Sequence, residues 1–196
     1  MTPTMENVET YLEQVKRALA ALPRERLAEL GEMLYRAYRN EKRVFTLGNG
    51  GSASTASHMA TDLAKNTIGP NMRRFSILSL NDNAAMITAL ANDLGYENVF
   101  REQLQNLIHP GDLLIAVSAS GNSPNVLHAI RYAHKQCAEV AGILGFEGGE
   151  AAKLVDVAIV VPSSHYGVVE DVHLIINHIL VDYFKSKLAE EQAWVV

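Results

Sequence analysis

From Lys42 onward, the chain alternates short apolar runs with longer stretches of helical spacing, and this alternation limits the possible folds most. The runs are rich in β-branched residues and are apolar on both faces. Such runs, joined by connections long enough for crossover helices, indicate a parallel sheet covered on both sides. The predicted strands span residues 44–47, 75–80, 113–118, 140–144 and 157–161. The sequence therefore predicts an α/β fold with a doubly wound, five-stranded parallel sheet.

The N-terminal region follows a different pattern, in which apolar residues recur every three or four positions. This spacing is typical of amphipathic helices, and Pro23 interrupts it. We expect a helical hairpin, or a helix with a break, outside the sheet. The chain then consists of an N-terminal helical extension over residues 1–41 and the sheet domain over residues 42–196, as a single domain overall. The apolar stripe of the extension needs a surface to pack on, and a partner subunit would provide one.

The composition is that of an ordinary globular protein, with 48% hydrophobic and 20% charged residues. The net charge is −5 and the 17 basic residues are scattered, so no nucleic-acid surface is expected. An anionic ligand would therefore be held mainly by backbone amides and hydroxyls. Cys137 is the single cysteine, which excludes an intramolecular disulfide, and no apolar run reaches the roughly 18 residues of a membrane span. These features predict a soluble, cytoplasmic protein without a membrane partner.

In doubly wound sheets, ligands bind beyond the carboxyl ends of the strands, where this chain carries two unusual loops. The first loop, residues 48–52, has the sequence Gly-Asn-Gly-Gly-Ser and leads into a helix that begins near Ala53. Its glycines permit a sharp turn, and the helix start offers free N–H groups to an anion. The P-loop pattern is absent, and Ala53 breaks the dinucleotide-binding pattern. Such a turn can also be purely structural.

The second loop, residues 118–123, has the sequence Ser-Ala-Ser-Gly-Asn-Ser and also precedes a helix. Its hydroxyl and amide groups can surround a phosphate. Ser123 alone could be a helix N-cap. Two loops of this kind in the same topological position predict a phosphate site, with a phosphorylated ligand.

Histidine and carboxylate side chains recur on two predicted helices. His58 and Asp62 are four residues apart and share a helix face, where they could bind a metal, exchange protons or simply form a surface hydrogen bond. On the last helix, Asp171 lies within about 20° of His178 and Glu170 within about 80°. Helix geometry therefore leaves the acidic partner of His178 open. His173 lies about 140° from His178, so these two imidazoles are not expected to serve one small site.

The chain resembles the sugar isomerase (SIS) domain family, and within it the phosphoheptose isomerases. The resemblance lies in both loops, in the Ala-Asn-Asp segment 91–93 and in residues 170–178. It implies a homotetramer with active sites where subunits meet. It also implies a substrate site formed by Asn49, Gly50, Gly51, Ser52, Asp62, Asn92, Asp93, Ser118, Ala119, Ser120, Ser123 and Glu170. The serines would hold the phosphate, while Asn92 and Asp93 would contact sugar hydroxyls or, alternatively, only end a helix.

The resemblance further implies a zinc ion held by His58, Asp62, Glu170 and His178, with Asp62 and His178 as the catalytic residues. Three positions depart from the family pattern: Asp62 replaces a glutamate, Glu170 a glutamine and Asn66 an arginine. Aspartate is shorter by one methylene, so a base at residue 62 reaches about 1.5 Å less far. All four predicted ligands can still bind zinc.

The implied activity is aldose–ketose isomerisation through an enediol. The resemblance indicates conversion of sedoheptulose 7-phosphate to D-glycero-D-manno-heptose 7-phosphate, a step in the supply of lipopolysaccharide precursors. The alternative is a non-catalytic SIS-domain protein that binds phosphosugars or associates with a replication initiator. Replication-initiator-associating relatives lack the metal histidine of the last helix, whereas His58 and His178 are both present here. The sequence therefore favours an enzyme, and bound zinc would distinguish the two.

Overall fold

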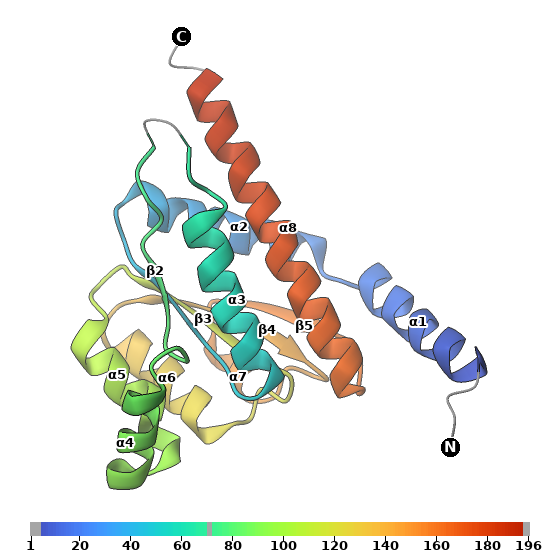
Figure 1. Cartoon of the computed structure of the whole chain (residues 1–196), viewed down its shortest axis with the longest axis horizontal. Helices are drawn as coiled ribbons and strands as arrows, with labels where there is room; N and C mark the ends of the chain where they lie inside the picture. The colour runs from blue at the N-terminus through green and yellow to red at the C-terminus, as the bar shows by residue number, and fades with distance from the viewer. Residues whose placement is uncertain (1–4, 70–71, 194–196) are drawn as a thin grey trace.

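Five parallel strands form the sheet of this computed structural model, in the order β2-β1-β3-β4-β5 (Figure 1). The structure describes residues 5–69 and 72–193. The strands are β1 Val44–Leu47, β2 Ile77–Ser79, β3 Leu113–Ser118, β4 Glu139–Gly145 and β5 Val157–Val161. All five predicted strands are confirmed. β2 begins later than predicted because Phe75 turns into the core and stacks on Tyr38, with ring centroids 5.8 Å apart.

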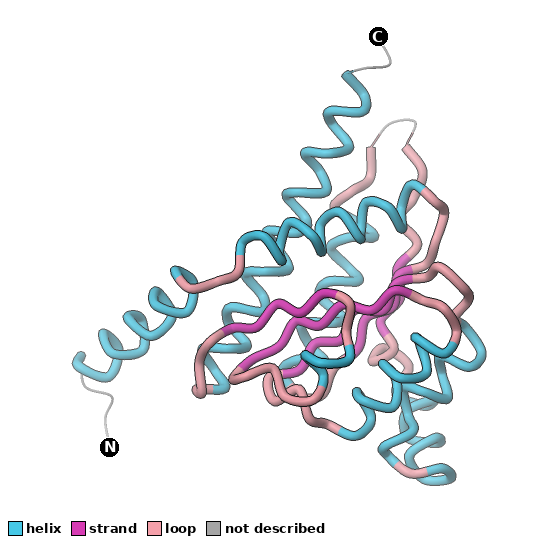
Figure 2. The backbone as a smooth tube through the Cα atoms, turned by 180° about the vertical axis from the view of Figure 1, so that it is seen from behind, coloured by secondary structure: helices cyan, strands magenta, loops and turns pink. Residues whose placement is uncertain are grey.

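Helices cover both faces of the sheet (Figure 2). They include α2 Arg24–Arg39, α3 Gly51–Lys65 and α8 Tyr166–Ala193 on one face, and α5 Val99–Leu107, α6 Pro124–Lys135 and α7 Ala151–Leu154 on the other. Alternate strand residues serve the two faces, as the β pleat requires. On β3, Leu113, Ile115 and Val117 pack in the first core, while Leu114 and Ala116 pack in the second. The doubly wound α/β fold is therefore confirmed.

The N-terminal extension consists of two helices that pack differently. α1 spans Met5–Ala20 and is separated from α2 by a segment that contains Pro23, so the predicted break is confirmed. α2 buries Leu30 and Leu34 in the core, and an added Cβ at its Gly31 would lie 2.7 Å from the ring of Tyr183 on α8. α1 projects from the body (Figure 2), and Ala18 is its one buried residue. α2 thus belongs to the core of the domain, while packing of α1 in an oligomer stays a prediction.

α4, which spans Ala84–Leu94, is apolar in sequence yet buries none of its residues. Asn83 caps it by accepting a hydrogen bond from the Met86 N–H, and Gly95 ends it with φ +86°. The short 3₁₀ helix η1, Tyr96–Asn98, follows directly. No helix within the described residues, α4 included, combines the length and the apolar character needed to cross a membrane.

The strand order places the topological switch point between β1 and β3. The chain leaves β1 toward β2 on one side of the sheet, and β3, β4 and β5 extend on the other. In open parallel sheets, the crevice at such a point is where ligands bind, outside the carboxyl ends of the strands. The first loop follows β1 and the second loop follows β3, so both predicted loops flank this crevice.

Candidate active site

The first loop turns sharply from β1 into α3 and is anchored by an asparagine that follows β2. Asn81 accepts a hydrogen bond from the Gly48 N–H at 3.1 Å and donates one to the Gly48 carbonyl at 2.8 Å. Gly50 has φ +56°, a backbone conformation that side-chain-bearing residues rarely adopt. α3 begins at Gly51, so its first free N–H groups face the strand ends. Ser52 is buried beneath Gly48, and its contact with a phosphate stays a prediction.

The second loop uses its serines to stabilise its own turn and leaves their hydroxyl protons available. Ser118 Oγ accepts a hydrogen bond from the Gly121 N–H at 3.1 Å, and Ser120 Oγ accepts one from the Asn122 N–H at 3.3 Å. Because these hydroxyls act as acceptors in the turn, each can still donate to a phosphate oxygen. Ser123 occupies the N-cap position of α6, but its side chain makes no capping hydrogen bond. The Ser123 hydroxyl is therefore not used to cap α6.

A close backbone approach fixes the shape of the second loop. Gly121 has φ +63°, and an added Cβ would lie 2.0 Å from the carbonyl oxygen of Gly148. Ala119, predicted to line the substrate site, is buried, and its carbonyl accepts a hydrogen bond from the Gly145 N–H at 3.1 Å. The loop is thus held against the end of β4, with Ser120 and Ser123 at its partly exposed edge.

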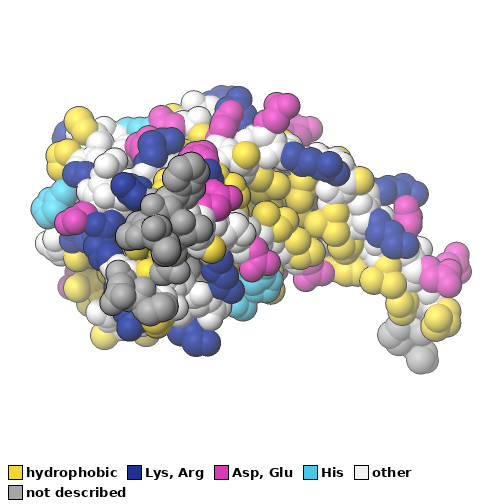
Figure 3. Space-filling model, turned by 90° about the horizontal axis from the view of Figure 1, so that it is seen from above, with side chains coloured by type: hydrophobic (Ala, Val, Ile, Leu, Met, Phe, Trp, Pro, Cys, Tyr) yellow, Lys and Arg dark blue, Asp and Glu magenta, His cyan; other side chains and the backbone are white. Residues whose placement is uncertain are grey.

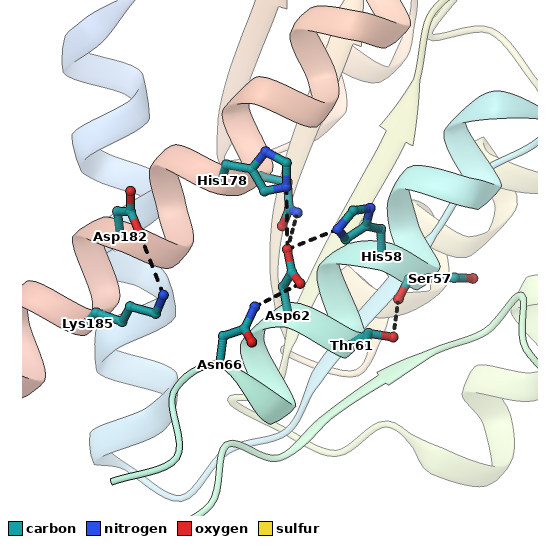
Figure 4. Close-up of polar contacts among 9 residues, drawn as sticks. Ser57, His58, Thr61, Asp62, Asn66, His178, Asp182 and Lys185 are labelled. Atoms are coloured by element: carbon teal, nitrogen blue, oxygen red, sulfur yellow. Dashed lines mark hydrogen bonds and ion pairs between the residues drawn. The ribbon is translucent and has the colours of Figure 1, made fainter.

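Two histidines and an aspartate converge between α3 and α8 (Figure 4). Nε2 of His58 lies 3.2 Å from Oδ2 of Asp62, and Nε2 of His178 lies 3.6 Å from the same oxygen. One ligand atom from each of the three side chains can be chosen so that all lie within 4.8 Å of one another. The His58 and His178 side chains are 43% and 53% exposed, whereas that of Asp62 is 14% exposed. The imidazoles therefore border solvent, with the carboxylate beneath them.

The structure separates Glu170 from this cluster. The Glu170 carboxylate lies against the first loop, where an added Cβ at Gly51 would come within 2.4 Å of it. Glu170 precedes His178 by eight residues, roughly 12 Å along a helix. Among the described residues, the cluster of candidate ligand atoms contains three of the four predicted ligands and not Glu170. Asp171 accepts a hydrogen bond from the Tyr11 hydroxyl at 2.7 Å and so faces α1, not His178.

The remaining candidate residues lie apart from the cluster. Asn92 and Asp93 are exposed near the end of α4, where the Asn92 amide donates to the Asp93 carboxylate at 2.8 Å. Their contact with sugar hydroxyls stays a prediction. His173 is fully buried, and burial lowers its pKa to about 4, although the Leu144 backbone partly opposes this shift. His173 is therefore a core residue and lies outside the cluster that contains His178.

Comparison with known proteins assigns the chain to a family. The profile of the SIS domain matches residues 7–145. The phosphoheptose isomerase of Geotalea daltonii is 32% identical over 191 residues, which cover 96% of this chain and 99% of that protein. The chain belongs to the phosphoheptose isomerases of the SIS-domain family. The predicted resemblance is thereby confirmed.

Further phosphoheptose isomerases support the assignment at the levels of sequence and fold. That of Sulfurimonas denitrificans is 36% identical over 163 residues and covers 83% of each chain. The solved structure of phosphoheptose isomerase GmhA from Neisseria gonorrhoeae has a TM-score of 0.84 at 27% identity, covering 92% of this chain and 96% of that one. The SIS fold predicted for the sheet domain is therefore confirmed as well.

Within this phosphoheptose isomerase framework, two carboxamides hold the Asp62 carboxylate. Asn66, which replaces the arginine of the family pattern, donates to Asp62 Oδ1 at 3.0 Å (Figure 4). Asn177 donates to Asp62 Oδ2 at 3.1 Å and is fully buried, and its own Oδ1 has no partner among the described residues. The shorter carboxylate is thus fixed from both sides. Asn177 is not among the site residues predicted from the sequence. The available signal is an amide directly after the apolar residues Ile175 and Ile176.

Proposed function

We propose that this enzyme interconverts sedoheptulose 7-phosphate and D-glycero-D-manno-heptose 7-phosphate. The observation that carries the proposal is the convergence of His58, Asp62 and His178 between α8 and α3, the helix that begins at the glycine-rich loop. The substrate follows from the relatives named as phosphoheptose isomerases, which match nearly the whole chain. Acid–base groups on a helix that starts at a phosphate-binding loop suit an aldose–ketose isomerase.

The cluster fits a zinc ion by its chemistry. Two imidazole nitrogens and one carboxylate oxygen are common zinc ligands, and three protein ligands leave a position open, as in catalytic zinc sites. His58, Asp62 and His178 would hold the ion. When bound, zinc supplies positive charge that stabilises negative charge developing on a substrate oxygen. Glu170 stays a proposed fourth ligand only if α8 or its side chain rearranges, because its carboxylate lies against Gly51.

The protein's own groups account for the proton transfers. Asp62 accepts the proton released when the C1–H bond of the ketose breaks and the C1–C2 enediol forms. The same carboxyl returns a proton to C2, forming the C2–H bond of the aldose. His178 supplies a proton to O2 and then takes the proton of the O1 hydroxyl, through the ring nitrogen that would not hold the ion. Asn66 and Asn177 hold the Asp62 carboxylate in one orientation during both transfers.

The loops and Glu170 bind and orient the substrate in this proposal. The hydroxyls of Ser118, Ser120 and Ser123 and the free N–H groups at the start of α3 would hold the phosphate. The Glu170 carboxylate is half-buried against the first loop and would accept hydrogen bonds from sugar hydroxyls. Asn92 and Asp93 would add further hydroxyl contacts from α4.

We also propose a homotetramer with active sites between subunits. Met5, Val8 and Leu12 on α1 are exposed, and Figure 3 shows hydrophobic side chains gathered where this projecting arm joins the body. α4, which carries Asn92 and Asp93, also buries no residue within the chain. A second copy packed on these helices would remove apolar surface from water. The cytoplasm is the proposed compartment, with the heptose product feeding lipopolysaccharide precursors.

The test compares wild type with His178→Gln, using His109→Gln as a control because His109 is an exposed histidine away from the cluster. Wild type and the control should convert sedoheptulose 7-phosphate to the aldose, followed by NMR. His178→Gln should lose turnover by at least about 100-fold, a typical contribution of one acid–base group, while it still binds the substrate. Full activity in His178→Gln would refute its role. A wild type that binds zinc and substrate without converting the sugar would favour the non-catalytic alternative.

A further inference from the structure

A reciprocal pair of carboxamides joins the two loops of the crevice. Asn49 in the first loop donates through Nδ2 to Asn125 Oδ1 at 2.9 Å, and Asn125 Nδ2 donates back to Asn49 Oδ1 at 2.9 Å. Asn125 is the second residue of α6, directly beyond the second loop, and it is 1% exposed. Its Oδ1 also accepts the Val126 N–H at 2.9 Å, so its own position is fixed.

A third group completes this arrangement from η1. The Tyr96 hydroxyl donates to Asn49 Oδ1 at 2.9 Å, although the Tyr96 side chain is largely exposed. Asn49 Oδ1 thus accepts two hydrogen bonds, which fill both of its lone pairs, and one of the two Nδ2 protons is used. Only one side-chain N–H of Asn49 remains for a ligand. The Asn49 side chain therefore serves mainly to hold the loop, and the loop presents backbone N–H groups.

The first loop needs such an anchor because its glycines impose few conformational restraints. An added Cβ at Gly50 would meet no atom within 4 Å, so side-chain packing does not restrain the tip of the turn. Asn81 holds the base of the loop at Gly48, whereas Asn125 and Tyr96 hold the following residue. A phosphate bound between the loops requires donors from both at a fixed separation, and an anchored loop loses less conformational entropy on binding.

We propose that Asn125 and the Tyr96 hydroxyl are positioning residues that act through Asn49 to hold the first loop ready for the phosphate group of the substrate. This inference rests on the proposed function for the identity of the ligand. It does not require turnover, because the property concerned is affinity for a phosphorylated ligand. Neither residue belongs to the His58, Asp62 and His178 cluster.

The experiment measures the dissociation constants of inorganic phosphate and of sedoheptulose 7-phosphate. The proteins compared are wild type, Tyr96→Phe, Asn125→Ala and the double variant. The same set is then measured in proteins that also carry Asn49→Ala. Tyr96→Phe removes one hydroxyl at the surface, and Tyr166→Phe is its matched control because Tyr166 is similarly exposed. We expect Tyr96→Phe to weaken binding about threefold and Asn125→Ala about tenfold, as one and two lost hydrogen bonds imply. Tyr166→Phe and the zinc affinity of all variants should stay at wild-type values.

The Asn49→Ala background distinguishes positioning from general destabilisation. If both residues act through Asn49, neither substitution should weaken binding further once Asn49 is truncated. Unchanged affinities in Tyr96→Phe and Asn125→Ala, or equal losses with and without Asn49, would overturn the inference. A wild type that binds sedoheptulose 7-phosphate without converting it would refute the proposed function and leave this test intact. Normal turnover with unchanged KM in both variants would refute the inference alone.

Discussion

The buried imidazole of His173 predicts a specific dependence of stability on pH. His173 is fully buried on α8, and neither ring nitrogen makes a hydrogen bond of standard geometry with a described residue. Burial lowers its pKa from 6.5 to about 4. The folded protein therefore holds this imidazole neutral at pH values where the unfolded chain binds a proton. Stability from this group is complete above pH 6.5 and is lost as the pH falls toward 4.

The size of the effect follows from the two pKa values. Between pH 7.5 and pH 4.5, protonation of His173 in the unfolded chain lowers the free energy of unfolding by about 2–3 kcal/mol. His173→Leu removes this contribution and replaces an imidazole that makes no hydrogen bond of standard geometry by an apolar side chain of similar volume. The variant should be close to wild type in stability at pH 7.5. The free energy of unfolding of the variant minus that of wild type should be about 2–3 kcal/mol larger at pH 4.5 than at pH 7.5.

Denaturant unfolding at both pH values, at one fixed protein concentration, measures this difference. The fixed concentration matters because any oligomer adds a concentration-dependent contribution to stability. His109→Leu, at an exposed position, controls for the loss of one histidine from the unfolded chain. An equal effect of His173→Leu on the free energy of unfolding at pH 4.5 and pH 7.5 would show that His173 is not held neutral by burial.

Two further substitutions test the site geometry. Glu170→Gln should leave zinc affinity unchanged, because Glu170 lies outside the His–Asp–His cluster, and should alter KM through the contact of Glu170 with the first loop. Calorimetric titration with zinc measures the affinity. A clear loss of zinc affinity would show that Glu170 is a zinc ligand. Gly121→Ala should destabilise the protein by at least about 2 kcal/mol, because the alanine Cβ meets the Gly148 carbonyl and φ is positive. Wild-type stability of Gly121→Ala in denaturant unfolding would contradict the close approach.

The sheet and its two loops were predictable because their signals are local. The apolar runs that predict the strands, such as Leu113–Ser118 with all its residues buried, depend only on neighbouring residues. Glycine and serine turns directly after two strands then fix the crevice, once parallel strands align their carboxyl ends. β2 was predicted too long because Phe75 is as apolar as a strand residue, while its actual partner, Tyr38, is distant in sequence.

The partners within the site were not predictable from spacing. The angles on α8 left Glu170 and Asp171 open, and the structure directs one to the first loop and the other to Tyr11 on α1. Choosing between them requires the position of α1 and α3 relative to α8, which no local pattern encodes. The Asn49–Asn125 pair was missed for the same reason, since its members lie 76 positions apart.

Isomerase activity is measured by following sedoheptulose 7-phosphate by NMR with the purified, zinc-loaded protein, before and after chelation. We expect conversion to the aldose heptose 7-phosphate, with activity lost on chelation and restored by zinc. Asp62→Asn, which removes the carboxylate shared by His58 and His178, should bind zinc more weakly and should not convert the sugar. Absence of aldose from the zinc-loaded wild type, despite measurable binding of sedoheptulose 7-phosphate, would contradict the proposed isomerase activity.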